Sequence, residues 1–329
     1  MGDSSVRVPL KNSTILVTGG AGFIGSHLVD RLLHEQAKQV IVVDNLFTGD
    51  KAHLSDALNK GAILYIDDAE IEGSLDYVFH RHSVDIVFNC ATKALNYSFL
   101  NPANAFMTNV VVLKNLLEQQ RKKAFQTLCH FSSSEAYGTS VYEPMDEQHP
   151  LHPTTAYAAG KAAADMLLQS YVQMFDLDAF IVRAFNNYGP RQSFHEELAA
   201  VIPKTIERIL KGKAPEMQGT GRQKRDFIYV ADTVDAVIKV YPKLQSGEVV
   251  NISADHPIAI GDLIQKISHL LHYSGEIIKK EPRKADVLNH HGCNKKLKAL
   301  IPDFTFTSFD QGLEKTIYWY QEKFNESFA

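Results

Sequence analysis

A tyrosine and a lysine four positions apart are the residues of this chain best suited to proton transfer. They are Tyr157 and Lys161, in Tyr157-Ala-Ala-Gly-Lys161. On a helix this spacing stacks both side chains on one face, one turn apart. A nearby ammonium favours the phenolate, so we expect Lys161 to lower the pKa of Tyr157 from its usual value of about 10. Such a phenol can accept a proton from an alcohol near neutral pH.

Strands and helices must alternate along the first half of the chain to position this pair. Short apolar runs predict buried strands at 14–17, 39–44, 62–67, 85–89 and 126–131, and helical periodicity covers 104–122. This alternation predicts a Rossmann-type α/β fold with a doubly wound parallel sheet, and ligands at the carboxyl ends of the strands. After Phe185 the alternation stops, although 199–210 is again typical of a helix.

A glycine-rich turn follows the first predicted strand. The sequence Thr18-Gly-Gly-Ala-Gly-Phe-Ile-Gly25 places Gly19, Gly22 and Gly25 ahead of a helical pattern. Glycines let the backbone approach a pyrophosphate, which then sits on the free N–H groups of the helix N-terminus. The second strand ends at Asp44, about 20 residues after the last glycine, where a dinucleotide fold places the acid that binds a ribose 2′-hydroxyl and repels a 2′-phosphate. NAD is therefore predicted over NADP.

Polar residues also follow the third and fifth predicted strands. The third ends in Asp67-Asp68, where Asp68 is placed to reach an adenine, and the fifth runs into Ser132-Ser-Ser-Glu135. A hydroxyl, a phenol and a lysine around a nicotinamide would suit the oxidation of an alcohol. In that arrangement Ser133 holds the substrate oxygen and Tyr157 takes its proton. Lys161 binds the nicotinamide ribose.

The composition excludes several classes of partner. The 329 residues are 45% hydrophobic and 22% charged, with a net charge of −4, so nothing electrostatic favours a nucleic acid or an anionic membrane. Three cysteines without a CxxC pair favour a reducing compartment. With no leader-like or membrane-spanning run, we expect a cytoplasmic enzyme. His290-His291-Gly-Cys293 lacks a second cluster at zinc-like spacing, so we expect an exposed loop and no metal site.

Taken together, these motifs resemble the extended short-chain dehydrogenase/reductases that modify nucleotide sugars, namely epimerases, 4,6-dehydratases and decarboxylases. The resemblance covers essentially the whole chain. Its motifs are the glycine turn with Phe23 and Ile24, Asp44-Asn45, Ser132-Ser-Ser-Glu-Ala-Tyr-Gly138, Tyr157-xxx-Lys161, Arg183-Ala-Phe-Asn-Asn-Tyr-Gly-Pro-Arg191, Arg225-Asp-Phe-Ile-Tyr-Val230 and Gly312-Leu-(x5)-Trp319.

The resemblance implies an NAD-binding domain over 1–185, which includes the Tyr/Lys helix. A smaller mixed α/β substrate domain would cover 186–329, with some exchange of chain between the two. It implies a homodimer, a nucleotide-sugar substrate carried on UDP, and arginines that clamp its diphosphate through paired donors. The substrate contacts it implies are Lys93, Ser133, Asn186, Arg225 and Arg283. The NAD contacts it implies are Gly19, Gly22, Phe23, Ile24, Gly25, Asp44, Asn45, Asp68, Lys93, Tyr157 and Lys161.

The family's reactions share a transient oxidation at C4 of the sugar and differ in the steps after it. Common dehydratases carry Asp-Glu where this chain has Ser134-Glu135, with the Asp as acid and the Glu as base, so the acid is replaced here by a hydroxyl. The loop from Glu135 to Tyr157 looks shorter than in the decarboxylases. We therefore expect 4-epimerisation first, 4,6-dehydration second and decarboxylation of a UDP-uronate third.

A protein that binds NAD without turnover, as a regulatory subunit, is the alternative outside enzymes, because fold alone does not give function. Such a protein would be expected to lose Tyr157 or Lys161. This chain retains both, which favours a catalyst.

Overall fold

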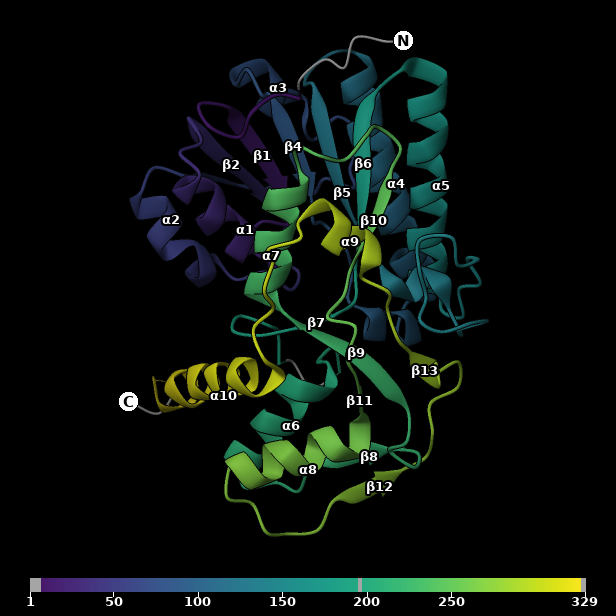
Figure 1. The fold of residues 1–329 in the computed structure, drawn as a ribbon. Coiled ribbons are helices and arrows are strands. Elements are labelled where there is room, and N and C mark those ends of the chain that lie inside the picture. The colour runs from purple at the N-terminus through teal and green to yellow at the C-terminus, as the bar shows by residue number, and fades with distance from the viewer. Residues whose placement is uncertain (1–6, 195–196, 327–329) are drawn as a thin grey trace.

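A seven-stranded parallel sheet forms the centre of the larger part of the molecule (Figure 1). The structure is a computed structural model that describes residues 7–194 and 197–326. The strands lie in the order β10-β6-β5-β4-β1-β2-β3, and all neighbours are parallel. Their bounds are β1 Thr14–Thr18, β2 Gln39–Asp44, β3 Ile63–Ile66, β4 Ile86–Asn89, β5 Thr127–Ser133, β6 Asp178–Ala184 and β10 Val249–Ile252.

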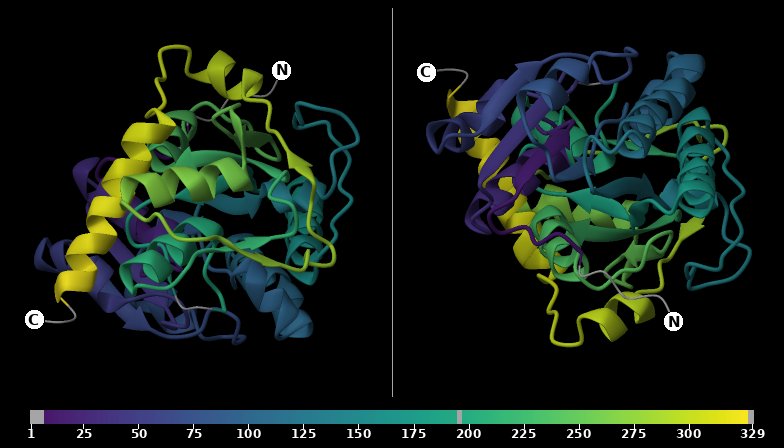
Figure 2. Two further views of the ribbon diagram at one scale, coloured as in Figure 1. Left: turned by 90° about the horizontal axis from the view of Figure 1, so that it is seen from below. Right: turned by 90° about the horizontal axis from the view of Figure 1, so that it is seen from above.

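Helices cover both faces of this sheet (Figure 2), which is why its central strands read as continuous apolar runs. One face packs against α1, α2, α7 and α9, through residues such as Leu28, Val237 and Leu297. The other packs against α3, α4 and α5, through residues such as Leu116 and Leu168. The helix bounds are α1 Phe23–His34, α2 Ser55–Asn59, α3 Asp76–Arg81, α4 Pro102–Arg121, α5 Ala156–Phe175, α7 Val230–Val240 and α9 Lys295–Leu300. Short 3₁₀ helices are η1 Lys51–Leu54, η2 Leu95–Phe99 and η3 Ser134–Tyr137.

The smaller part lies beyond the carboxyl ends of the large sheet and has its own core, which contains Tyr188, Ile206 and Leu263. It holds a four-stranded sheet and a two-stranded sheet. The strands are β7 Asn186–Tyr188, β8 Glu216–Gln218, β9 Lys224–Tyr229, β11 Pro257–Ala259, β12 Ile278–Lys280 and β13 Asn289–His290, and the helices are α6 Val201–Leu210, α8 Ile260–Leu270 and α10 Phe309–Glu326.

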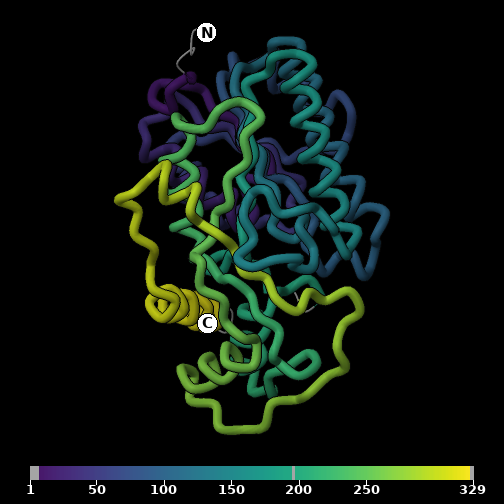
Figure 3. The backbone as a smooth tube through the Cα atoms, turned by 45° about the vertical axis from the view of Figure 1, so that its right-hand side comes forward, coloured from purple at the N-terminus to yellow at the C-terminus, as the bar shows by residue number. Residues whose placement is uncertain are grey.

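The predicted strands and their parallel, doubly wound arrangement are confirmed. Where a strand begins or ends at a different residue than predicted, the difference is one or two residues. The second half of the chain also contributes to the large sheet. Strand β10 pairs with β6, and α7 and α9 return to cover the same face as α1 (Figure 3). The division at residue 185 stays a prediction. Among the described residues, no helix is long and apolar enough to cross a membrane.

A half-buried histidine joins α1 to the chain that follows β7. His27 Nε2 lies 3.0 Å from the carbonyl oxygen of Pro190, and Arg191 pairs with Asp30 at 2.8 Å. Burial lowers the pKa of His27 to about 4, although the bond to Pro190 acts in the opposite direction. The histidine is thus neutral in the folded protein down to about pH 4.

We expect His27→Gln to reduce the acid sensitivity of the fold. As pH falls from about 6.5 to about 4, the unfolded chain binds a proton at His27 before the folded chain does, so stability is lost in this window. Removing the group should shrink the loss of unfolding free energy between these pH values by about 2–3 kcal/mol. Denaturant titrations at both pH values measure it. His34→Gln, on an exposed position of the same helix, is the control, and equal effects of the two variants would contradict the prediction.

Candidate active site

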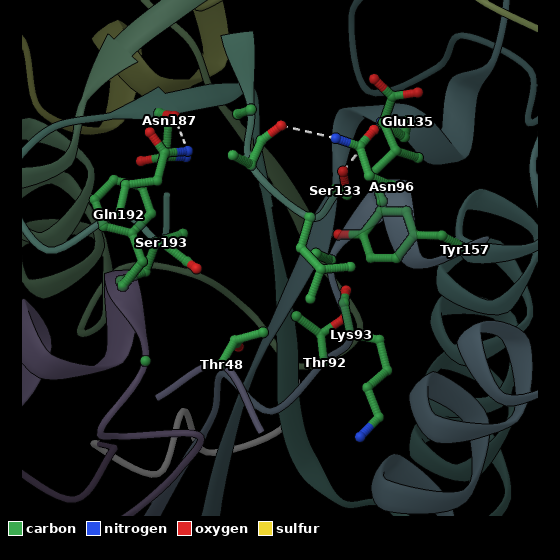
Figure 4. Close-up of a pocket in the computed structure, with 18 of the residues that line it drawn as sticks. Thr48, Thr92, Lys93, Asn96, Ser133, Glu135, Tyr157, Asn187, Gln192 and Ser193 are labelled. Carbon is green, nitrogen blue, oxygen red and sulfur yellow. Dashed lines mark hydrogen bonds between the residues drawn. The ribbon is translucent and has the colours of Figure 1, made fainter. Parts of the chain in front are cut away.

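A cleft of about 1140 Å³ lies where the smaller part meets the strand ends of the large sheet (Figure 4). Of the residues predicted for the site, Lys161 alone does not line it and lies beneath the surface. All the other predicted site residues line the cleft: Gly19, Gly22, Phe23, Ile24, Gly25, Asp44, Asn45, Asp68, Lys93, Ser133, Ser134, Glu135, Tyr157, Asn186, Arg225 and Arg283. The fold therefore brings together residues that are spread over most of the sequence.

The glycine turn connects β1 to α1 at one end of the cleft. Gly19 has φ +69°, and a Cβ there would lie 2.7 Å from the backbone of Ala91. A Cβ on Gly25 would meet the backbone of Gly19 and Gly20. Only glycine fits at both positions without displacing backbone. Helix α1 begins directly after Gly22, so its free N–H groups and positive dipole end suit the pyrophosphate of a dinucleotide.

Asp44 ends β2 beside this turn. Its side chain is buried and accepts hydrogen bonds of 2.8 Å from the backbone N–H groups of Ala21 and Leu46. Burial raises the pKa of Asp44, and the backbone N–H groups oppose the shift. Asn45 donates to Asp68 at 2.9 Å, so these three polar side chains form one continuous edge of the cleft.

Tyr157 and Ser133 face the cleft from neighbouring elements. Helix α5 begins at Ala156, and the Tyr157 N–H donates to Ser98 Oγ at 2.9 Å. Ser133 is the last residue of β5. Figure 4 shows the Tyr157 ring next to Ser133, with Thr92 on its other side. A phenol and two aliphatic hydroxyls thus converge where a sugar alcohol could be held.

The expected effect of Lys161 on the phenol is wrong in this structure. The pair does lie one turn apart on α5, with Lys161 Nζ 5.9 Å from the Tyr157 ring centroid. However, burial raises the pKa of Tyr157 to about 12, and the neighbouring hydroxyls of Ser133 and Thr92 lower it only in part. The Lys161 ammonium instead donates to the carbonyl oxygen of Phe131 at 2.7 Å, and burial lowers its own pKa to about 8 against the attraction of Asp165.

A buried cluster of charged groups supports α5 from below. Asp165 accepts hydrogen bonds from Arg183 Nε at 2.9 Å and from Ser132 Oγ at 2.8 Å. His130 Nε2 lies 3.8 Å from the other carboxylate oxygen, and all four side chains are buried. Asp165 lies one turn beyond Lys161 on the same helix. The cluster therefore ties the helix that carries the Tyr/Lys pair to β5 and β6.

Ser134 and Glu135 open the 3₁₀ helix η3 directly after Ser133. Figure 4 shows Glu135 beside Ser133 and Tyr157, with its carboxylate turned away from the Tyr157 hydroxyl. His290 lies next to Glu135, with Nδ1 3.9 Å from Oε1. The prediction of an exposed loop at residues 290–293 is wrong, because His290 and Cys293 are both buried. Pairing of β13 with β9 brings this segment against the site.

Three of the basic residues predicted for ligand binding, Lys93, Arg225 and Arg283, line the cleft. Lys93 is buried, with Nζ 3.7 Å from the ring centroid of Phe47. Arg225 and Arg283 share one oxygen of Asp286, at 2.7 Å and 3.5 Å. The pairing holds two guanidinium groups together, which is the arrangement that a diphosphate requires.

Several residues that line the cleft were not predicted from the sequence. Thr92 follows β4, whose carboxyl end was the signal that could have identified it. Asn96 receives a hydrogen bond of 2.8 Å from Arg283, and no local pattern predicts that long-range contact. The cleft also includes a charged group in which Lys204 and Arg208 pair with Glu216 at 3.0 Å and 3.3 Å. Within the described part of the chain, no three His, Cys, Asp or Glu side chains are grouped to hold a metal.

Comparison with known proteins gives consistent matches over nearly the whole chain. Residues 15–253 match the NAD dependent epimerase/dehydratase family. UDP-glucuronic acid decarboxylase 3 of Arabidopsis thaliana is 31% identical, covering 82% of this chain and 80% of its own. Human dTDP-D-glucose 4,6-dehydratase is 28% identical, covering 94% and 91%. The structure of UDP-glucose 4-epimerase from Thermotoga maritima with UDP-glucose has a TM-score of 0.87 and 32% identity, covering 94% and 99%.

Proposed function

The chain belongs to the NAD dependent epimerase/dehydratase family, and from this membership we propose that it modifies a nucleotide sugar through transient oxidation at C4. The observation that carries the proposal is that Tyr157 and Ser133 share one cleft with the glycine turn and with Arg225 and Arg283. The cleft thus holds groups suited to a dinucleotide, an alcohol and a diphosphate.

Each residue has a role that its position supports. The glycine turn and Asp44 would hold NAD, which when bound would supply reversible hydride transfer and so no net oxidation. Ser133 orients the sugar hydroxyl, and Tyr157 accepts its proton at the phenolic oxygen in the phenolate form, which burial disfavours in this structure. Lys161, held by the carbonyl of Phe131, places a positive charge beneath the phenol, and its predicted contact with the nicotinamide ribose would require its ammonium to reach the cleft that it does not line here. The glycine turn, Asp44, Asn45, Asp68 and the other predicted contacts hold the dinucleotide.

The substrate we propose is a UDP-hexose. Its diphosphate would lie against Arg225 and Arg283, which Asp286 holds side by side, with Asn186 nearby on β7. The choice of UDP follows relatives such as the Thermotoga enzyme, whose structure contains UDP-glucose. A homodimer stays a prediction of the resemblance, and a cytoplasmic location stays a prediction of the composition.

We propose 4-epimerisation as the reaction. It requires only that the 4-keto sugar turn over and be reduced on its other face, and Ser134 is a poor substitute for the acid of the common dehydratases. A 4,6-dehydratase is the second candidate, because Glu135 lies at the cleft, where it would act as the base. Decarboxylation of a UDP-uronate is third.

Incubating the protein with NAD and UDP-glucose, followed by NMR of the products, tests this function. We expect interconversion of UDP-glucose and its C4 epimer without accumulation of NADH. A 4-keto-6-deoxy product would instead establish the dehydratase, and CO₂ released from UDP-glucuronate would establish the decarboxylase. Bound NAD without turnover of any nucleotide sugar would favour a regulatory subunit.

A further inference from the structure

We propose that His290 is a positioning residue that shares a single proton with Glu135 and so keeps a proton donor at the edge of the cleft. His290 is fully buried on β13, and its ring packs against Phe185 with centroids 5.5 Å apart. Glu135 is nearly buried but lines the cleft. The two residues are far apart in sequence and meet because β13 pairs with β9.

The hydrogen bond on one side of the ring fixes the tautomer of His290. Its Nε2 lies 3.0 Å from the backbone carbonyl oxygen of Ser134. Because a carbonyl oxygen only accepts hydrogen bonds, Nε2 must carry a hydrogen. In a neutral ring the other nitrogen, Nδ1, then carries no hydrogen, and its lone pair can accept a hydrogen bond.

That second nitrogen faces the carboxyl group of Glu135. Nδ1 lies 3.9 Å from Glu135 Oε1, and no residue described in the structure gives this buried nitrogen a hydrogen bond. A neutral histidine opposite an ionised carboxylate would set two acceptors against each other, and an unsatisfied buried polar atom costs about 1–3 kcal/mol. One proton between them removes the conflict, because either the carboxylic acid donates to Nδ1 or the imidazolium donates to the carboxylate.

A small rotation completes the contact. The last torsion of a glutamate has a broad energy profile, so the carboxyl group can turn toward Nδ1 without leaving its rotamer. The histidine cannot move as easily, because the Ser134 carbonyl and the Phe185 ring hold it. His290 is therefore the fixed member of the pair and Glu135 the mobile one.

The pKa of His290 is lowered overall, and the groups around the ring act on it in opposite directions. Burial lowers the pKa of His290, Glu135 raises it, and Arg225 and His149 lower it. Arg225 lies opposite His290 in the strand pairing, and its own charge is balanced by Asp286. A full positive charge on His290 is thus unfavourable unless Glu135 shares the proton.

The pair would supply the acid that 4,6-dehydration requires and that the Ser134-Glu135 sequence lacks, so its use on a sugar belongs to the second candidate reaction. The Ser134 hydroxyl is too weak an acid to protonate a leaving group, and an ionised Glu135 can only accept a proton. A shared proton gives this edge of the cleft a donor as well as an acceptor. The shared proton itself does not depend on the proposed function, whereas its use on a sugar does.

NMR of the protein labelled with ¹⁵N-histidine tests the shared proton without any substrate. The His290→Gln variant identifies the His290 signals. We expect wild-type Nδ1 to carry or share a hydrogen near pH 7, and to become a bare ring nitrogen in Glu135→Met. A bare Nδ1 in the wild type, unchanged between about pH 5 and about pH 9 and identical in Glu135→Met, would overturn the proposal.

Turnover with the accepted nucleotide sugar tests the use of the proton. We expect His290→Gln to lower kcat by about tenfold or more and to displace the pH profile of kcat. The matched control is His291→Gln, whose ring pairs with Asp255 at 2.7 Å and should leave the profile in place. If His290→Gln lowers kcat with an unmoved profile, His290 is only structural. If no nucleotide sugar is turned over, the proposed function fails while the NMR result still decides the shared proton.

Discussion

Tyr157→Phe is expected to abolish turnover while the protein still binds NAD and nucleotide. The variant keeps the aromatic ring that fills the space at the start of α5 and removes only the hydroxyl group that faces Ser133 and Thr92 (Figure 4). Without that oxygen, no group at the same position can take the sugar proton. Proton transfer by a positioned side chain contributes about 10²–10⁴-fold, so we expect kcat to fall by about 10³-fold.

Steady-state kinetics and calorimetric titration with NAD and UDP separate these two effects. Tyr171→Phe is the matched control, since it removes a hydroxyl from the same helix at a position that contacts Glu118 away from the cleft. That control should retain full activity. Tyr157→Phe with unchanged kcat would refute the assigned role, and loss of NAD binding would show that the substitution had damaged the cleft itself.

Asp165→Asn is expected to cost about 3–5 kcal/mol of unfolding free energy, because it leaves Arg183 buried without a counter-charge. The carboxylate accepts from both Arg183 and Ser132 and is fully enclosed. The neutral amide keeps the shape but removes the charge. Chemical denaturation measures the loss directly.

The partner of the ion pair provides a further test of that cost. Adding Arg183→Met to Asp165→Asn should recover at least about half of the loss, because the second change removes the uncompensated charge and keeps an apolar stem. Glu72→Gln breaks an exposed pair with Lys114 and should cost less than about 1 kcal/mol. An equally small effect of Asp165→Asn would show that the buried cluster does not stabilise the fold.

Local patterns were sufficient for the elements of the large sheet and for the glycine turn. The apolar runs that became β1, β2 and β4 are buried on both faces, so their composition alone identified them. Asp44 was recognisable from its spacing to Gly25. These features depend on neighbours in sequence, and sequence analysis can therefore detect them.

Features set by distant parts of the chain were not accessible in this way. The pKa of Tyr157 depends on how completely the cleft walls remove water, which no spacing to Lys161 reveals. His290 was assigned to an exposed loop because the pairing of β13 with β9 joins segments about 60 residues apart. The burial of Lys93 was likewise not predictable, because Lys93 follows β4 and packs against Phe47, which follows β2.

The position of β10 also determines when the fold can close during synthesis. Strand β6 carries Arg183 and borders the strand that ends at Ser133, yet its outer edge stays unpaired until residues 249–252 have been made. An exposed edge of buried apolar composition is prone to pair with other chains. A nascent chain that ends after the Tyr/Lys helix and β6 therefore still exposes the outer edge of β6 to other chains. A fragment that stops near residue 185 is expected to aggregate.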